Sequence, residues 1–218
     1  MKQEKEANMK NKITVGLFGK LHGLTSKLNT DLPLLGFAPF EIDPSDLAYP
    51  PSTVAVICTI ADSHPSQNQR GSKELNELSL LIESLKDDKV HLIYVSIAGS
   101  NHPEVPIADL GHLNLQAEIL IRSSQIPYTI VRAMSADDRP GSHHKIFWKQ
   151  DFQGKQKGQE HPIPLEDLSQ VLVHCVNRSQ VISKTFTVHA VAGDPIANWD
   201  QWFLGLNSDS DSKHRKIA

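Results

Sequence analysis

The feature that most constrains the fold is an alternation of two kinds of segment along the chain. Short, continuous apolar runs rich in Val, Ile and Thr are typical of strands buried on both faces, and they span residues 13–18, 51–60, 90–96, 128–132 and 185–191. Longer segments carry one apolar stripe with three- and four-residue spacing, as amphipathic helices do, and they span residues 73–86, 113–124 and 165–177. Buried strands that alternate with amphipathic helices form βαβ units. The sequence therefore predicts an α/β protein with a Rossmann-like, doubly wound parallel sheet.

Length and composition favour one domain. The chain has 218 residues, of which 39% are hydrophobic and 22% charged, as in an ordinary globular domain. We expect this domain to span residues 12–205, with polar, flexible tails at 1–11 and 206–218. The formal net charge of −3 argues against a nucleic-acid partner. Neither a signal peptide nor a membrane-spanning run is seen, so a cytoplasmic location without a membrane partner is expected.

A glycine-rich turn follows the first predicted strand. Gly16, Gly19 and Gly23 form a GxxGxxxG pattern, one residue longer than most short-chain nucleotide-binding turns. Glycines at this place let the backbone turn tightly and approach a pyrophosphate at the N-terminus of the next helix. The strand before and the helix after favour binding of NAD or NADP. A turn that binds nothing is the alternative.

The segment after the first helix is short. Residues 36–43 lead through an Asp-Pro-Ser-Asp turn into the next strand, where a full Rossmann half would add a strand and a helix. Asp43 follows Gly23 by about 20 residues, where an acid can accept a hydrogen bond from an adenosine ribose. Capping of the turn is an equally good interpretation. Thr59 ends the strand at the carboxyl edge of the sheet and is a predicted cofactor neighbour. No Lys or Arg is placed to bind a ribose 2′-phosphate.

The second half carries a more specific pattern. A strand at 90–96 ends in Val-Ser and is followed by Ile-Ala-Gly-Ser; residues 117–132 read Ala-Glu-Ile-Leu-Ile-Arg-Ser-Ser-Gln-Ile-Pro-Tyr-Thr-Ile-Val-Arg, and Ile-Pro-Leu-Glu-Asp-Leu follows at 163–168. These segments resemble the atypical short-chain dehydrogenase/reductases, most closely the branch similar to the regulator NmrA and to flavin and biliverdin reductases. The resemblance covers roughly residues 12–195. It implies a nucleotide-binding Rossmann fold, a catalytic role for Ser96 and a cofactor-binding role for Arg132, which match the family's serine and arginine.

The proton-transferring pair of the wider family is missing. Its Tyr-x-x-x-Lys would fall on Leu110 and Asn114 or, two residues later, on His112 and Gln116. His112 is the candidate replacement acid, because a histidine can donate a proton at neutral pH. The alternative for His112 is a helix residue that faces water. Without the pair, a planar acceptor such as a flavin or quinone is favoured over a simple ketone, since the hydride chemistry belongs to the cofactor.

The favoured function is an NAD(P)-dependent reductase of this type, acting on a small planar acceptor without the Tyr-Lys acid pair. The alternatives are a catalytically silent relative that binds a dinucleotide or a protein partner, and a non-redox enzyme that uses the former cofactor pocket. A homodimer is possible.

Other candidate chemistry is weak. No metal site is expected, because His-x-x-x-His and Cys-x-x-Cys pairs are missing. Cys58 and Cys175 are interpreted as small buried apolar residues, and Trp199, Trp202 and Phe203 as core packing or a dimer contact.

Overall fold

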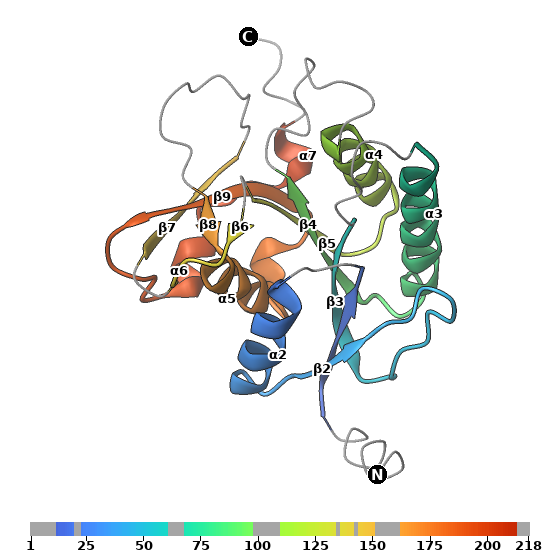
Figure 1. The fold of residues 1–218 in the computed structure, drawn as a ribbon, viewed down its shortest axis with the longest axis horizontal. Coiled ribbons are helices and arrows are strands. Elements are labelled where there is room, and N and C mark those ends of the chain that lie inside the picture. Colours follow the sequence, from blue (N-terminus) through green and yellow to red (C-terminus); the bar gives the residue numbers. More distant parts are fainter. Residues whose placement is uncertain are drawn as a thin grey trace.

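The computed structural model describes residues 12–19, 23–60, 68–97, 110–133, 136–141, 144–150 and 162–212. Within them, a seven-stranded sheet runs in the order β2-β1-β3-β4-β5-β9-β7 (Figure 1). Its strands are β1 (Thr14–Phe18), β2 (Ala38–Glu41), β3 (Thr53–Thr59), β4 (His91–Ile97), β5 (Tyr128–Ala133), β7 (His144–Lys149) and β9 (Lys184–Ala192). Every neighbouring pair is parallel except β7 and β9. The short strands β6 (Ala136–Asp137) and β8 (Ile163–Pro164) pair separately.

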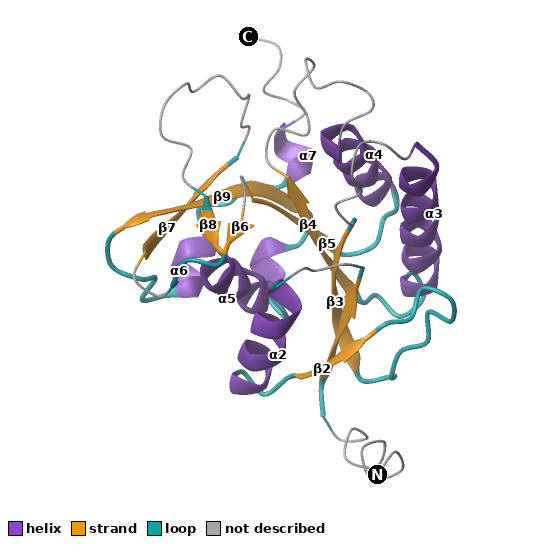
Figure 2. Ribbon diagram, in the orientation of Figure 1, coloured by secondary structure: helices purple, strands orange, loops and turns teal. Residues whose placement is uncertain are grey.

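Helices cover both faces of the sheet (Figure 2). On one side lie α2 (Leu24–Leu34), α5 (Leu165–Cys175) and α6 (Trp199–Phe203), and on the other α3 (Asn68–Leu85) and α4 (Leu110–Ser123). A 3-10 turn, η1 (Ser179–Val181), precedes β9, and α7 (Asp209–Ser212) follows α6. Each layer of helices buries its apolar stripe against the sheet, so two apolar cores form, one on each face. The predicted doubly wound α/β fold is confirmed.

The predicted shortening after the first helix is also confirmed. Residues 42–52 carry the chain from β2 past β1 to β3 without a helix or strand between them. β2 is consequently the edge of the sheet. Its Pro39 is tolerated there, because an edge strand needs backbone hydrogen bonds on only one side.

Two features at the C-terminal side differ from the expectation or go beyond it. β7 pairs antiparallel with β9 and alternates buried and exposed residues, with Ile146 facing the core. The segment predicted as a tail from residue 206 packs against the domain as far as Asp209. Leu206 is buried, and Asp209 accepts hydrogen bonds from the Thr185 N–H (2.9 Å) and hydroxyl (2.7 Å). Residues 1–11 and 213–218 lie outside the described residues.

The aromatic residues near the C-terminus pack against the domain. Phe203 is fully buried, and the Trp202 indole N–H donates to the Ile146 carbonyl oxygen at 3.1 Å. Core packing, one of the two interpretations of this cluster, is what the structure shows for these two side chains.

In the part of the chain that the structure describes, no helix is both long and apolar enough to cross a membrane.

Candidate functional site

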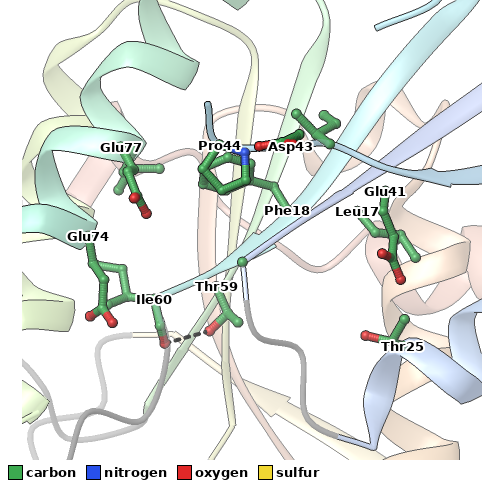
Figure 3. Close-up of a pocket in the computed structure, with 13 residues that line it drawn as sticks. Leu17, Phe18, Thr25, Glu41, Asp43, Pro44, Thr59, Ile60, Glu74 and Glu77 are labelled. Atoms are coloured by element: carbon green, nitrogen blue, oxygen red, sulfur yellow. Dashed lines mark hydrogen bonds between the residues drawn. The ribbon is translucent and has the colours of Figure 1, made fainter. Parts of the chain in front are cut away.

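A cavity of about 620 Å³ opens at the carboxyl ends of β1, β2 and β3. Along the chain, β1 is followed by β2 on one side and then by β3 on the other, so the strand order reverses at this point. Open α/β sheets bind ligands in the crevice outside the strand ends at such a reversal. Figure 3 shows Thr59 and Ile60 in the middle of the cavity, with α3 on one side and the start of α2 on the other.

The three glycines of the turn have different roles. Gly19 lines the cavity with φ +84°, and a Cβ on it would lie 2.2 Å from the Thr59 carbonyl oxygen. Gly23 has φ +60° at the start of α2, where a Cβ would lie 2.8 Å from Leu165 Cδ1. Gly16 is inside β1, and a Cβ there would lie 2.6 Å from Ile42 Cδ1. Gly19 and Gly23 therefore shape the turn, whereas Gly16 makes room for core packing. Residues 20–22 lie outside the described residues.

Four carboxylates line the cavity. Asp43 and Glu41 come from β2 and the residues after it, and Glu74 and Glu77 come from α3 (Figure 3). Glu77 lies 3.6 Å from Lys73 on the same helix. No described residue that lines the cavity is basic. Among the described residues, no three His, Cys, Asp or Glu side chains are grouped to hold a metal ion. The cavity suits a ligand that donates hydrogen bonds and carries no negative charge at this end.

Asp43 caps the turn and also lines the cavity. Its Oδ1 accepts hydrogen bonds from the Ser45 hydroxyl (2.6 Å) and the Ser45 backbone N–H (2.8 Å). These bonds lower the pKa of Asp43, so its carboxylate is ionised at neutral pH. The capping interpretation is thus observed, and the contact with a ribose stays a prediction. Thr59 also lines the cavity, and its hydroxyl donates to the Val95 carbonyl oxygen at 3.1 Å.

Ser96 and Arg132 are brought together elsewhere, around a buried carboxylate. They are register partners on β4 and β5, and both bind Glu118 of α4. The Ser96 hydroxyl donates to Glu118 Oε1 at 2.7 Å, and the Arg132 guanidinium donates to both carboxylate oxygens at 2.9 and 2.6 Å. Arg122 adds a third donor, to Oε2 at 2.8 Å. The observed role of Ser96 and Arg132 is to tie α4 to the sheet; their roles in catalysis and cofactor binding stay predictions.

The charge of Glu118 is maintained by its partners. Complete burial raises the pKa of Glu118, but the hydrogen bonds and charges of Arg132 and Arg122, with the Ser96 hydroxyl, outweigh it and hold this pKa below its usual value. The cluster is therefore an ion pair at neutral pH.

No protein-family model matches the chain, and no curated protein sequence matches it either. Solved structures do. A protein from Bacillus halodurans, described as a putative NAD-dependent epimerase/dehydratase, aligns with a TM-score of 0.69 and 16% identity over 84% of this chain and 95% of its own. The likeness shows a Rossmann-like fold.

Two further solved structures have a similar fold. A protein from Streptococcus pneumoniae, described as a putative NADH-flavin reductase, has a TM-score of 0.62 and 15% identity over 82% of this chain and all of its own. A short-chain dehydrogenase/reductase from Veillonella parvula, solved with NADP, has a TM-score of 0.58 and 14% identity over 86% of this chain and all of its own. At such identities the likeness is one of fold.

The positions expected for the Tyr-Lys pair lie on α4. Asn114 is buried there and accepts a hydrogen bond from the Tyr94 hydroxyl at 2.8 Å, so it is part of the packing between α4 and the sheet. The side chain of His112 lies outside the described residues, and its role as an acid stays a prediction.

Sequence reasoning missed Glu41, Glu74 and Glu77. Glu41 ends β2 at the carboxyl edge, a position that could have marked it. Glu74 and Glu77 stand on a helix in which many exposed positions are polar, so nothing local distinguishes them.

Proposed function

We propose that the chain is an NAD(P)-dependent oxidoreductase that reduces a small planar acceptor. The observation that carries the proposal is the 620 Å³ cavity at the point where the strand order reverses. The turn at Gly19 lines this cavity, and a side chain on Gly19 would clash with the backbone of Thr59. Gly19 and the N-terminus of α2 would hold the pyrophosphate, Asp43 would accept from the adenosine ribose, and Thr59 would lie beside them. The dinucleotide supplies hydride-transfer chemistry when bound.

The carboxylates of the cavity favour NAD(H) over NADP(H). A ribose 2′-phosphate would enter a site lined by Asp43, Glu41, Glu74 and Glu77, with no basic side chain among the described lining residues. The ribose hydroxyls of NAD(H) can instead donate hydrogen bonds to these groups. Like charges at short range raise the free energy of the bound phosphate.

The absence of a Tyr-Lys pair from the sequence supports a planar acceptor. The reduced forms of flavins and quinones tolerate negative charge, so they can accept a hydride without an immediate proton donor. A ketone would develop an alkoxide without the usual acid, and positioned acid catalysis is typically worth about a hundred- to ten-thousand-fold in rate.

A second candidate is a catalytically silent relative that binds a dinucleotide. Ser96, which matches the family's serine, is buried, and its hydroxyl donates a hydrogen bond to Glu118. A serine in this position contributes to the stability of the fold whether or not the protein turns over a substrate.

Titration calorimetry with NADH, NAD⁺, NADPH and NADP⁺ tests the binding step. We expect NADH to bind and NADPH to bind at least about tenfold more weakly, a difference of about 1.4 kcal/mol. Gly19→Glu should abolish binding. Gly36→Glu is the matched control, because Gly36 also has a positive φ but lies at the other end of α2, and a Cβ there meets nothing within 4 Å.

The outcomes separate the candidates. Absence of binding by all four nucleotides would overturn both the reductase and the silent dinucleotide-binding candidate. Binding followed by oxidation of NADH by a flavin or by menadione supports the reductase. Binding without turnover of any acceptor supports the silent candidate.

A further inference from the structure

A histidine–aspartate pair lies at the carboxyl edge of the sheet, away from the cavity described above. His144 begins β7 and is the register partner of Ala192, at the end of β9. Asp167 is in the first turn of α5. His144 Nδ1 lies 3.0 Å from Asp167 Oδ2, and the Asp167 side chain is only 4% exposed. The contact between these two atoms is not aligned as a hydrogen bond, and it becomes an ion pair when the ring is protonated. A buried carboxylate beside one ring nitrogen can favour one orientation of an imidazole during proton transfer.

The pair leaves the far side of the imidazole ring open. His144 Nδ1 is buried, although 24% of the side chain is exposed. The solvent-exposed part of the side chain therefore excludes this nitrogen. A partly exposed imidazole can exchange a proton with a molecule outside the protein surface.

The backbone at Gly141 lies close against this histidine–aspartate pair. The Gly141 N–H donates to Glu166 Oε2 at 3.0 Å, and a Cβ on Gly141 would lie 2.8 Å from Asp167 Oδ1. The chain thus approaches the first turn of α5 as closely as only a glycine permits. Positions with such close backbone approach hold neighbouring side chains in a defined geometry.

The place of the pair fits the reactive end of a dinucleotide. The Leu165 side chain, at the first residue of α5, would lie 2.8 Å from a Cβ on Gly23 at the start of α2, so the N-terminal ends of the two helices are adjacent. The adenosine cavity lies at the β2–β1–β3 end of the sheet, whereas β7 is the opposite edge. A dinucleotide with its adenosine in the cavity and its pyrophosphate at α2 would extend from β3 toward the α5 and β7 side.

We propose that His144 is the general acid of the reductase and that Asp167 is its positioning residue. This inference rests on the proposed function. As a quinone takes a hydride from NADH, one of its oxygens gains negative charge and the nicotinamide becomes NAD⁺. In the same step the Nε2–H bond of the protonated imidazole breaks and the proton forms an O–H bond with that oxygen, which gives the hydroquinone; solvent then reprotonates the neutral ring. His144 thereby supplies the acid that the missing Tyr-Lys pair leaves out.

Two carboxylates lie near His144 among the described residues. Asp167 faces it from α5, and Asp137 lies near it on β6. Arg139 is bound to Asp137, and its hydrogen bonds are the main reason that the pKa of Asp137 is lowered. Only a protonated imidazole can donate a proton, so the rate should fall as pH rises.

Single-turnover kinetics on the full chain tests the pair. NADH bound to the protein is mixed with 9,10-phenanthrenequinone between pH 5.5 and 8.5, and the loss of absorbance at 340 nm is followed. We expect His144→Gln to remove the pH dependence of this step and to slow it at pH 6 by about a hundredfold, the lower end of what a positioned acid supplies, because a quinone tolerates part of the charge. Asp167→Asn should slow it less, and Asp167→Glu, which keeps the carboxylate, should retain most of the rate. The matched control is His189→Gln on β9, whose ring stacks on Phe147 at 5.7 Å between centroids.

Calorimetry with NADH on the same variants separates the two proposals. The acid role is supported if His144→Gln binds NADH with the affinity of the parent protein while its single-turnover rate is slow and independent of pH. Normal rates in His144→Gln, or NADH binding by the parent protein without reduction of the quinone, would overturn it. No NADH binding by the parent protein would overturn the proposed function, and the acid role with it. Urea denaturation of His144→Gln separates the two roles, because a pair that serves only stability would change the free energy of unfolding and leave the rate of the folded protein unchanged.

Discussion

At the scale of single residues, Glu118 is the charge on which the packing of α4 depends. It is fully buried and bound to Ser96, Arg132 and Arg122. Glu118→Gln would leave the buried Arg132 guanidinium without a counter-charge, and we expect the free energy of unfolding to fall by about 3–5 kcal/mol. Urea denaturation measures it. The control Glu83→Gln breaks only an exposed pair with Lys86 and should cost less than about 1 kcal/mol, so equal losses would contradict this account.

A second residue-scale prediction concerns acid stability. Burial lowers the pKa of His91 to about 3, and its Nε2 lies 2.8 Å from Thr129 Oγ1. An unfolded histidine titrates near 6.5, so between pH 6.5 and 3 the unfolded state binds the extra proton. Stability should therefore be constant above pH 6.5 and fall below it, by up to about 1.4 kcal/mol per pH unit for this group.

His91→Gln should reduce that slope in urea denaturation at pH 4.5 to 6.5. Some slope will remain, because burial and then the charge of Arg178 lower the pKa of His174 to about 4. A variant with the slope of the parent protein would show that His91 is not the group that titrates.

At the scale of elements, the turn from β1 to α2 depends on the backbone of β3. A Cβ on Gly19 would meet the Thr59 carbonyl oxygen at 2.2 Å, an atom that the sheet holds in place. Gly36→Ala meets nothing within 4 Å and should cost only its positive φ, about 1–2 kcal/mol. We expect Gly19→Ala to cost about 1–3 kcal/mol more, measured by thermal unfolding. Equal costs would mean that the turn moves away from β3.

At the scale of the whole molecule, the two apolar cores should open together. Cys58 belongs to the core under α3 and α4, and Cys175 to the core under α2 and α5. Both thiols are buried, and burial raises the pKa of each, which disfavours the reactive thiolate. Mass spectrometry after timed alkylation in low urea should show both cysteines labelled at one rate, equal to that of global unfolding. Faster labelling of Cys175 would show that the second half of the domain opens separately.

Periodicity in the sequence determined the layers of this protein. Continuous apolar runs and single apolar stripes predict five of the strands and three of the helices. A strand that is buried on both faces and a helix that is buried on one face each have a characteristic spacing of apolar residues. Three residues that line the cavity were indicated by other local features: Gly19 by the glycine turn after the first strand, Asp43 by its spacing from Gly23, and Thr59 by the end of its strand. Strand β7 gave no comparable signal, because its three consecutive apolar residues, Ile146, Phe147 and Trp148, are flanked by polar residues on both sides.

Tertiary structure alone decided which side chains meet. Glu74 and Glu77 join Asp43 only because α3 packs beside the end of β2, and Ser96 and Arg132 turn to Glu118 only because α4 lies over β4 and β5. His144 on β7 and Asp167 on α5 are distant along the chain, yet His144 Nδ1 lies 3.0 Å from Asp167 Oδ2. Local spacing reports the burial of each residue, whereas partners distant along the chain are set by how helices pack on the sheet.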